Sequence, residues 1–279
     1  MYGIVTRNEE ELTWPEFDRT FFEMKDVTGR ATEPVAGAVN MISAFGDNAA
    51  VEGDPTLAPV DRNGTPATRE RPYFDWDYIC PTRETYREGI LEMVEDAAAV
   101  NEDVRLDDIG FPRDEYCYCE RCRELFAESE YENREEWRNN VITEFVAEAR
   151  ERVPGDLYMT LYPDPYPGHL ERRSGIDVDA LSEYVDEFVI PIYDLAYETT
   201  YWLEVIARGF VDRLETPFSI ELYAINIDIE NLIHAMEVAD EYADSVLFGY
   251  EAGNARAAIR RKRADQRDGV SHGPDETDE

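Results

Sequence analysis

Apolar and polar positions follow two different rhythms along the chain. Seven short apolar runs have the length and the content of β-branched and aromatic residues that favour strands. They span residues 2–7, 36–45, 104–111, 156–163, 186–194, 217–224 and 244–251. Between most of them lie longer segments in which apolar residues recur every three to four positions, as they do in amphipathic helices.

These helical segments fill most of the intervals between the runs. They span residues 82–100, 134–153, 178–188, 199–214 and 228–243, and a further helix is expected from about residue 14 to residue 25. Strand–helix alternation along a whole chain indicates a parallel sheet covered by helices. Eight strands would close a (β/α)8 TIM barrel. We expect the eighth strand, irregular or missing, within residues 51–71.

An open, doubly wound sheet is the alternative to a barrel. Such sheets often carry a Gly-rich phosphate turn after a strand, and none of the seven runs is followed by one. The runs end instead in acids and tyrosines, which suits the polar mouth of a barrel. We expect a barrel domain over residues 1–258 and, because residues 259–279 show no apolar face, a disordered charged tail.

Composition narrows the environment and the partners. The 279 residues include 63 acidic and 27 basic side chains, a net charge of -36, which repels nucleic acids and anionic membranes. Only Lys25 and Lys262 are lysines. Acidic excess with few lysines resembles the proteins of extreme halophiles, in which molar salt screens the repulsion between acids. No signal-peptide or membrane-spanning run is visible, so we expect a cytoplasmic protein, and a homo-oligomer is compatible with these features.

Four cysteines form a candidate metal site. Cys117, Cys119 and Cys122 follow the strand that begins at residue 104, and Cys80 precedes the helix expected from residue 82. In a barrel both loops would lie at the carboxyl ends of neighbouring strands, where four thiolates could bind one structural Zn²⁺. Free thiols are the alternative, and a redox C-x-x-C site is less favoured because no thioredoxin-like context surrounds it.

The segment from residue 73 to residue 126 resembles a known family. A strand ending in paired polar residues, then a C-x-C-x-x-C loop with a fourth cysteine upstream, resembles glycoside hydrolase family 42, the microbial β-galactosidases, and related uncharacterised glycosidase-like barrels. That family has Asn-Glu on strand four, with Glu as the general acid/base, and a nucleophilic Glu at the end of strand seven. The resemblance implies Asp108 as acid/base, Asp107 in place of the Asn, and Glu221 as nucleophile.

A second alignment changes these roles. The stretch "RLDDI" is also similar to the Arg-x-Asp strand of α-amylase-type barrels, which implies Asp107 as the nucleophile with Arg105 beside it. Strand alternation places Arg105 and Asp107 on one side and Asp108 on the other. Alternation often breaks at a strand end, so both assignments remain open.

Other residues at the strand ends are candidates for binding substrate. Trp76 could stack against a sugar ring, a tyrosine at the end of a strand could donate to the nucleophile, and Arg7 could instead form a structural ion pair with Glu221. The full set is Arg7, Trp76, Tyr162, Asp164, Tyr193, Asp194, Tyr223, Tyr250 and Glu251.

The sequence therefore predicts a glycoside hydrolase that acts on a carbohydrate substrate with a pair of carboxylates from strands four and seven. The alternative is a barrel with structural zinc that binds carbohydrate without cleaving it, or that serves as a scaffold. A metal-dependent hydrolase that cleaves another type of bond is less favoured, because a catalytic zinc needs an open coordination position and four thiolates would leave none.

Overall fold

The computed structural model describes residues 1–268, which form a closed barrel of eight parallel strands in chain order. The strands are β1 (Tyr2–Thr6), β2 (Arg19–Lys25), β3 (Val39–Ser43), β4 (Val104–Asp107), β5 (Leu157–Thr160), β6 (Glu187–Pro191), β7 (Phe218–Tyr223) and β8 (Ser245–Gly249). Pairing of β1 with β8 closes the ring, with Ile4 opposite Phe248. The expected (β/α)8 TIM barrel is confirmed.

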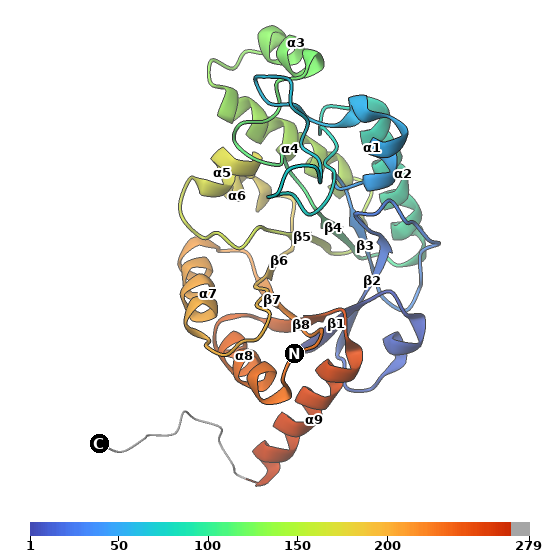
Figure 1. The fold of residues 1–279 in the computed structure, drawn as a ribbon. Coiled ribbons are helices and arrows are strands. Elements are labelled where there is room, and N and C mark those ends of the chain that lie inside the picture. The colour runs from blue at the N-terminus through green and yellow to red at the C-terminus, as the bar shows by residue number, and fades with distance from the viewer. Residues whose placement is uncertain (269–279) are drawn as a thin grey trace, which may run out of the picture.

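Helices surround the strands on the outside of the barrel (Figure 1). They are α1 (Asn48–Gly53), α2 (Glu84–Val100), α3 (Glu120–Glu128), α4 (Arg134–Arg150), α5 (His169–Ser174), α6 (Val178–Leu181), α7 (Tyr201–Arg213), α8 (Ile229–Tyr242) and α9 (Ala252–Asp268), with 3-10 helices at Glu9–Thr13 and Pro55–Leu57. Their apolar faces and the outward side chains of the strands form the larger core. No helix within residues 1–268 is long and apolar enough to cross a membrane.

The helix expected between residues 14 and 25 is wrong, because β2 occupies Arg19–Lys25. Alternation along β2 sends Phe21 into the barrel interior, beside Val5 and Met41, and Phe22 into the outer core. Buried Glu23 and Lys25 hide this alternation in the sequence, because charged residues at strand positions look like the polar face of a helix. The eighth strand is therefore β2, and residues 51–71 contribute no strand to the barrel.

The tail expected from residue 259 is also wrong over its first part. Helix α9 continues to Asp268, with Ile259 fully buried. Lys262 Nζ lies 2.6 Å from Asp240 Oδ2, and Arg260 Nε donates to Glu16 Oε1 at 2.7 Å. The basic residues of α9 thus pair with acids on neighbouring elements, which a search for an apolar face cannot detect. Residues 269–279 lie outside the described part of the chain.

Candidate active site

A cavity of about 300 Å³ opens at the carboxyl ends of the strands, a volume at the lower end of the usual range for small-molecule sites. Its walls come from the ends of β1, β2, β4, β5, β6 and β8 and from the loops after β3 and β4. Of the predicted site residues it is lined by Arg7, Trp76, Asp107, Asp108, Tyr162, Tyr193 and Tyr250. Active sites of TIM-barrel enzymes lie at this end of the barrel.

Asp107 and Asp108 both reach this cavity, although neighbouring residues of a strand normally point to opposite sides. Strand β4 ends at Asp107, and Asp108 has a φ of 51°, in the left-handed region. The backbone N–H of Asp108 donates to Asp107 Oδ1 at 2.9 Å, which holds the turn. Ser43 Oγ, at the end of β3, donates to Asp108 Oδ2 at 2.6 Å.

The environment of Asp108 favours its neutral form. Burial raises the pKa of Asp108 to about 8, and the negative charge of Asp107 adds to the increase. The hydrogen bond from Ser43 and the charge of Lys25 oppose this shift without cancelling it. At neutral pH, Asp108 is therefore an acid that still holds its proton, beside a second carboxyl group that faces the same cavity.

Glu221 lies beneath the cavity and does not line it. Its side chain is 0% exposed, and Arg105 Nη2 approaches Glu221 Oε2 to 2.7 Å. Tyr193 donates its hydroxyl to Glu221 Oε1. Burial and the charge of Glu221 raise the pKa of Tyr193, so the hydroxyl keeps its proton. The expected contact between a strand-end tyrosine and Glu221 is present, but the partner of Glu221 is Arg105 and not Arg7.

Arg105 connects this buried pair to the cavity. Its Nη2 also lies 3.8 Å from Asp107 Oδ2 and donates to Thr160 Oγ1 at 2.9 Å. Burial alone would lower the pKa of Arg105, but Glu221 and Asp107 outweigh burial and raise it. Asp107 Oδ2 and Glu221 Oε2 both lie near Arg105 Nη2, so these two oxygens are at most about 6.5 Å apart. In inverting glycosidases the separation of the two carboxyl groups starts at roughly 6.5 Å.

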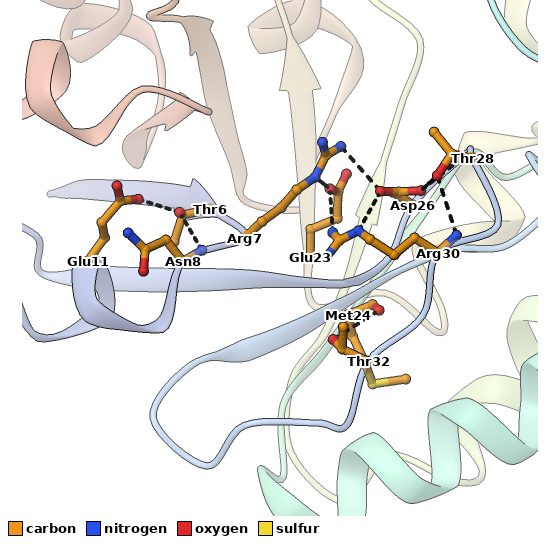
Figure 2. Close-up of polar contacts among 10 residues, drawn as sticks. All are labelled: Thr6, Arg7, Asn8, Glu11, Glu23, Met24, Asp26, Thr28, Arg30 and Thr32. Carbon is orange, nitrogen blue, oxygen red and sulfur yellow. Dashed lines mark hydrogen bonds and ion pairs between the residues drawn. The ribbon is translucent and has the colours of Figure 1, made fainter.

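A second group of charges surrounds Arg7 at one side of the cavity; of this group only Arg7 and Glu23 line the cavity, and the sequence predicted only Arg7. Figure 2 shows the guanidinium of Arg7 between Glu23 and Asp26, with Arg30 on the other side of the two acids. Arg7 donates to Glu23 Oε2, and Arg30 Nε donates to Asp26 Oδ2 at 3.0 Å. Burial raises the pKa of Glu23, and Arg7 opposes that increase. Glu23 was missed because the segment that carries it was interpreted as a helix.

Aromatic side chains complete the cavity wall. Trp76 and Tyr78 lie together, with ring centroids 5.5 Å apart, and the indole N–H of Trp76 has no hydrogen-bond partner among residues 1–268. Tyr162 and Tyr193 are about half exposed as whole residues, while the hydroxyl of Tyr193 lies inward against Glu221. A wall of this kind offers flat apolar faces together with polar donors, as sugar rings require.

The remaining predicted binding residues lie elsewhere. Asp164 Oδ2 lies 3.0 Å from His169 Nδ1, and both residues line a neighbouring groove. Asp194 Oδ1 accepts a hydrogen bond from the N–H of Ala196 at 2.8 Å, within its own loop. Glu251 accepts from the N–H of Gly253 at the start of α9. Tyr223 packs behind Tyr193, with centroids 5.4 Å apart. None of these four residues lines the cavity.

The four cysteines come together as the sequence predicts. Their sulfur atoms all lie within 4.8 Å of one another, and all four residues are buried. Cys80 Sγ is 3.3 Å from Cys122 Sγ and 4.0 Å from Cys119 Sγ, while a tetrahedron with Zn–S bonds of about 2.3 Å has edges of roughly 3.8 Å. The N–H of Cys119 donates to Cys117 Sγ at 3.3 Å, a contact that favours a thiolate. The donor set therefore fits a metal ion that joins the loops after β3 and β4.

Comparison with known proteins supports the fold alone. No protein-family model matches the chain, and no curated protein sequence matches it. The α-L-fucosidase isoenzyme 2 of Paenibacillus thiaminolyticus has a TM-score of 0.61 and 13% identity, over 92% of this chain and 46% of that chain. A family GH18 chitinase of Cycas revoluta, in complex with allosamidin, has a TM-score of 0.55 and 10% identity, over 95% of this chain and 98% of that chain.

This chain thus spans less than half the length of that fucosidase. These two structures are TIM barrels of glycoside hydrolases. At 13% and 10% identity, the similarity shows that this chain has the same barrel architecture.

Proposed function

We propose that this protein is a glycoside hydrolase that acts at the cavity lined by Asp107 and Asp108. The observation that carries the proposal is a carboxyl group, Asp108, held in its neutral form beside a second carboxyl group in a cavity with aromatic walls. Glycosidases need such a division, with one carboxyl protonated and one ionised. We propose a relationship to glycoside hydrolase family 42, the microbial β-galactosidases, because of the strand-four and cysteine motifs.

Asp108 is the general acid in this proposal. Because Oδ2 accepts from Ser43, we place the proton on Oδ1. Transfer of that proton to the glycosidic oxygen accompanies cleavage of the bond to the anomeric carbon, and the leaving group departs as an alcohol. A water molecule then bonds to the anomeric carbon and gives one proton back to Asp108, which restores the acid. Asp107 supplies the negative charge that stabilises the positive anomeric carbon, and the charge of Arg105 lies 3.8 Å from its carboxylate.

Glu221 is a second candidate for the anionic role, because Tyr193 and Arg105 both bind it as they would a nucleophile. This assignment requires the two partners to move, since Glu221 is fully buried. We therefore assign Glu221 to positioning Arg105 and Tyr193. The cysteine cluster holds structural zinc, which supplies no open position for chemistry and fastens the loop that carries Asp108.

The test is hydrolysis in concentrated KCl of p-nitrophenyl β-D-galactoside, α-L-fucoside, β-D-glucoside and β-D-glucuronide. With a cleaved substrate, Asp108→Asn should reduce turnover less for p-nitrophenyl glycosides than for alkyl glycosides, because a good leaving group needs little protonation. Asp107→Asn should reduce turnover for both classes by orders of magnitude. Binding of sugars without cleavage of any would support the non-catalytic barrel instead.

A further inference from the structure

One arginine of the cavity differs from the other two in its charge environment. Arg7 pairs with Glu23, and Arg105 pairs with Glu221. Arg173 lines the same cavity, yet within residues 1–268 no carboxylate lies within ion-pair distance of its guanidinium. In a chain with 63 acidic and 27 basic residues, a cavity arginine without an acidic partner is unexpected.

The guanidinium of Arg173 lies over an aromatic ring. Its Cζ is 3.9 Å from the ring centroid of Tyr162, which also lines the cavity. A cation–π contact of this kind leaves the N–H donors of the guanidinium available for hydrogen bonds to a ligand. A free guanidinium edge matches the geometry of a carboxylate or a sulfate, which it can bind through two parallel hydrogen bonds.

Hydrogen bonds from α4 and from the loop after β4 hold the backbone that carries Arg173. Arg138, a buried residue of α4, donates to the carbonyls of Arg172 at 2.7 Å, of Arg173 at 2.8 Å and of Arg113 at 2.9 Å. The N–H of Phe111 donates to the carbonyl of Ser174 at 2.9 Å. The end of α5 is thereby joined to α4 and to the loop that follows Asp108. Arg173 is held at a fixed place relative to the proposed acid, and this lowers the entropic cost of binding.

We propose that Arg173, which lies over the ring of Tyr162, binds a negatively charged substituent of the substrate, so that the preferred substrate is a glycoside bearing a carboxylate or a sulfate. The assignment of the cleavage step rests on the proposed function, whereas the anion subsite can be measured by binding alone. The neutral form of Asp108 is compatible with an anionic sugar, because a protonated acid does not repel it.

The test compares Arg173→Met with Arg172→Met, a matched control that removes the same charge from the exposed neighbour on α5. Isothermal titration would use D-glucuronic acid, D-galacturonic acid, D-glucose 6-sulfate and neutral D-glucose. Turnover would be compared on p-nitrophenyl β-D-glucuronide and β-D-glucoside. Arg173→Lys keeps the charge without the planar fork and serves as the second variant if Arg173→Met folds poorly.

We expect wild type and Arg172→Met to bind at least one anionic sugar more tightly than D-glucose. Arg173→Met should lose at least about tenfold of that affinity, with no change for D-glucose, and Arg173→Lys should lose part of it. Selective binding of a uronic acid or of the sulfated sugar identifies the charged group. Failure to bind any anionic sugar, or equal loss for charged and neutral sugars, overturns the subsite. Anion binding through Arg173 without turnover would retain the subsite and refute the glycosidase function.

Discussion

At the scale of single residues, Asp108 in the cavity and Glu221 beneath it are carboxyl groups in different surroundings. Asp108 is partly buried and lies beside the negative charge of Asp107, and both conditions favour its neutral form. Glu221 is buried as well, but the guanidinium of Arg105 lies 2.7 Å from it and balances its charge. The sign of the neighbouring charge makes the difference: the negative Asp107 favours a protonated Asp108, whereas the positive Arg105 forms an ion pair with Glu221.

The neutral Asp108 should make the stability of the fold depend on pH. An unfolded aspartate titrates near about pH 3.9, whereas the folded pKa is about 8, so between these values only the folded state binds the proton. The free energy of unfolding therefore falls as pH rises through this window. Asp108→Asn mimics the neutral form and removes this dependence. We expect it to melt at a higher temperature than wild type above about pH 8 and at a similar temperature near pH 4.

Differential scanning calorimetry across this pH range checks the expectation, with Ser43→Ala as the control. Ser43 opposes the rise in the pKa of Asp108, so its removal should extend the pH dependence and not abolish it. Equal pH dependence of wild type and Asp108→Asn would show that Asp108 titrates in its ordinary range.

Glu221→Gln tests the buried ion pair. Removing one charge leaves Arg105 buried without its main partner, and breaking a buried pair in this way typically costs about 3–5 kcal/mol. We expect chemical denaturation to show a loss of that order. Tyr193→Phe is the matched control, because it removes one hydrogen bond to Glu221 and leaves the charges paired. A Glu221→Gln variant as stable as wild type would mean that Glu221 is solvated and accessible, which would favour it as the nucleophile.

At the scale of elements, the cysteine cluster brings together the segments that follow β3 and β4. Cys80 belongs to the first loop. Cys117 and Cys119 belong to the second loop, which begins at Asp108, and Cys122 lies in α3, which follows that loop. These loops contain few regular elements, and a four-thiolate metal site would hold them together where backbone pairing does not.

We expect about one zinc per chain in protein purified without chelator, as a single four-thiolate site requires. Cys119→Ser should lose the metal and lower the melting temperature, because metal binding is coupled to folding. Thr82→Val is the control: the Thr82 hydroxyl lies 3.2 Å from Cys122 Sγ but is not one of the four sulfur ligands. Elemental analysis and thermal melts give both results. Wild-type protein without metal would contradict the site.

Comparison of sequence and structure shows which elements were predictable. The cysteine spacing and the adjacent Asp107 and Asp108 are visible in the local sequence, which therefore predicts the cluster of thiols and places both acids at the cavity. Strand β2 was missed because Glu23 and Lys25 are buried charges, which the hydrophobic pattern cannot represent. The contact between Arg105 and Glu221 joins β4 to β7 and forms only when the barrel closes. The left-handed backbone of Asp108 likewise has no local sequence signal.

At the scale of the whole molecule, the net charge of -36 is the dominant feature. Many arginines are paired with acids, including Arg19 with Glu187 at 2.9 Å and Arg150 with Asp186 at 2.6 Å. With 63 acidic and 27 basic residues, most acids nevertheless have no basic partner available. The unbalanced acids repel one another in dilute salt, and this repulsion opposes the compact state.

Salt should therefore stabilise this protein strongly. The Debye length is about 10 Å at 0.1 M and about 3 Å at 1 M, so molar KCl screens repulsion between neighbouring surface acids that dilute buffer leaves intact. We expect the melting temperature to rise markedly between roughly 0.1 M and 3 M KCl. The same series in sucrose is the control, since sucrose favours burial without screening charge. Equal melting temperatures in both KCl concentrations would show that local ion pairs, such as those of α9, already balance the acids. A rise in sucrose equal to that in KCl would assign the effect to solvent exclusion and not to charge.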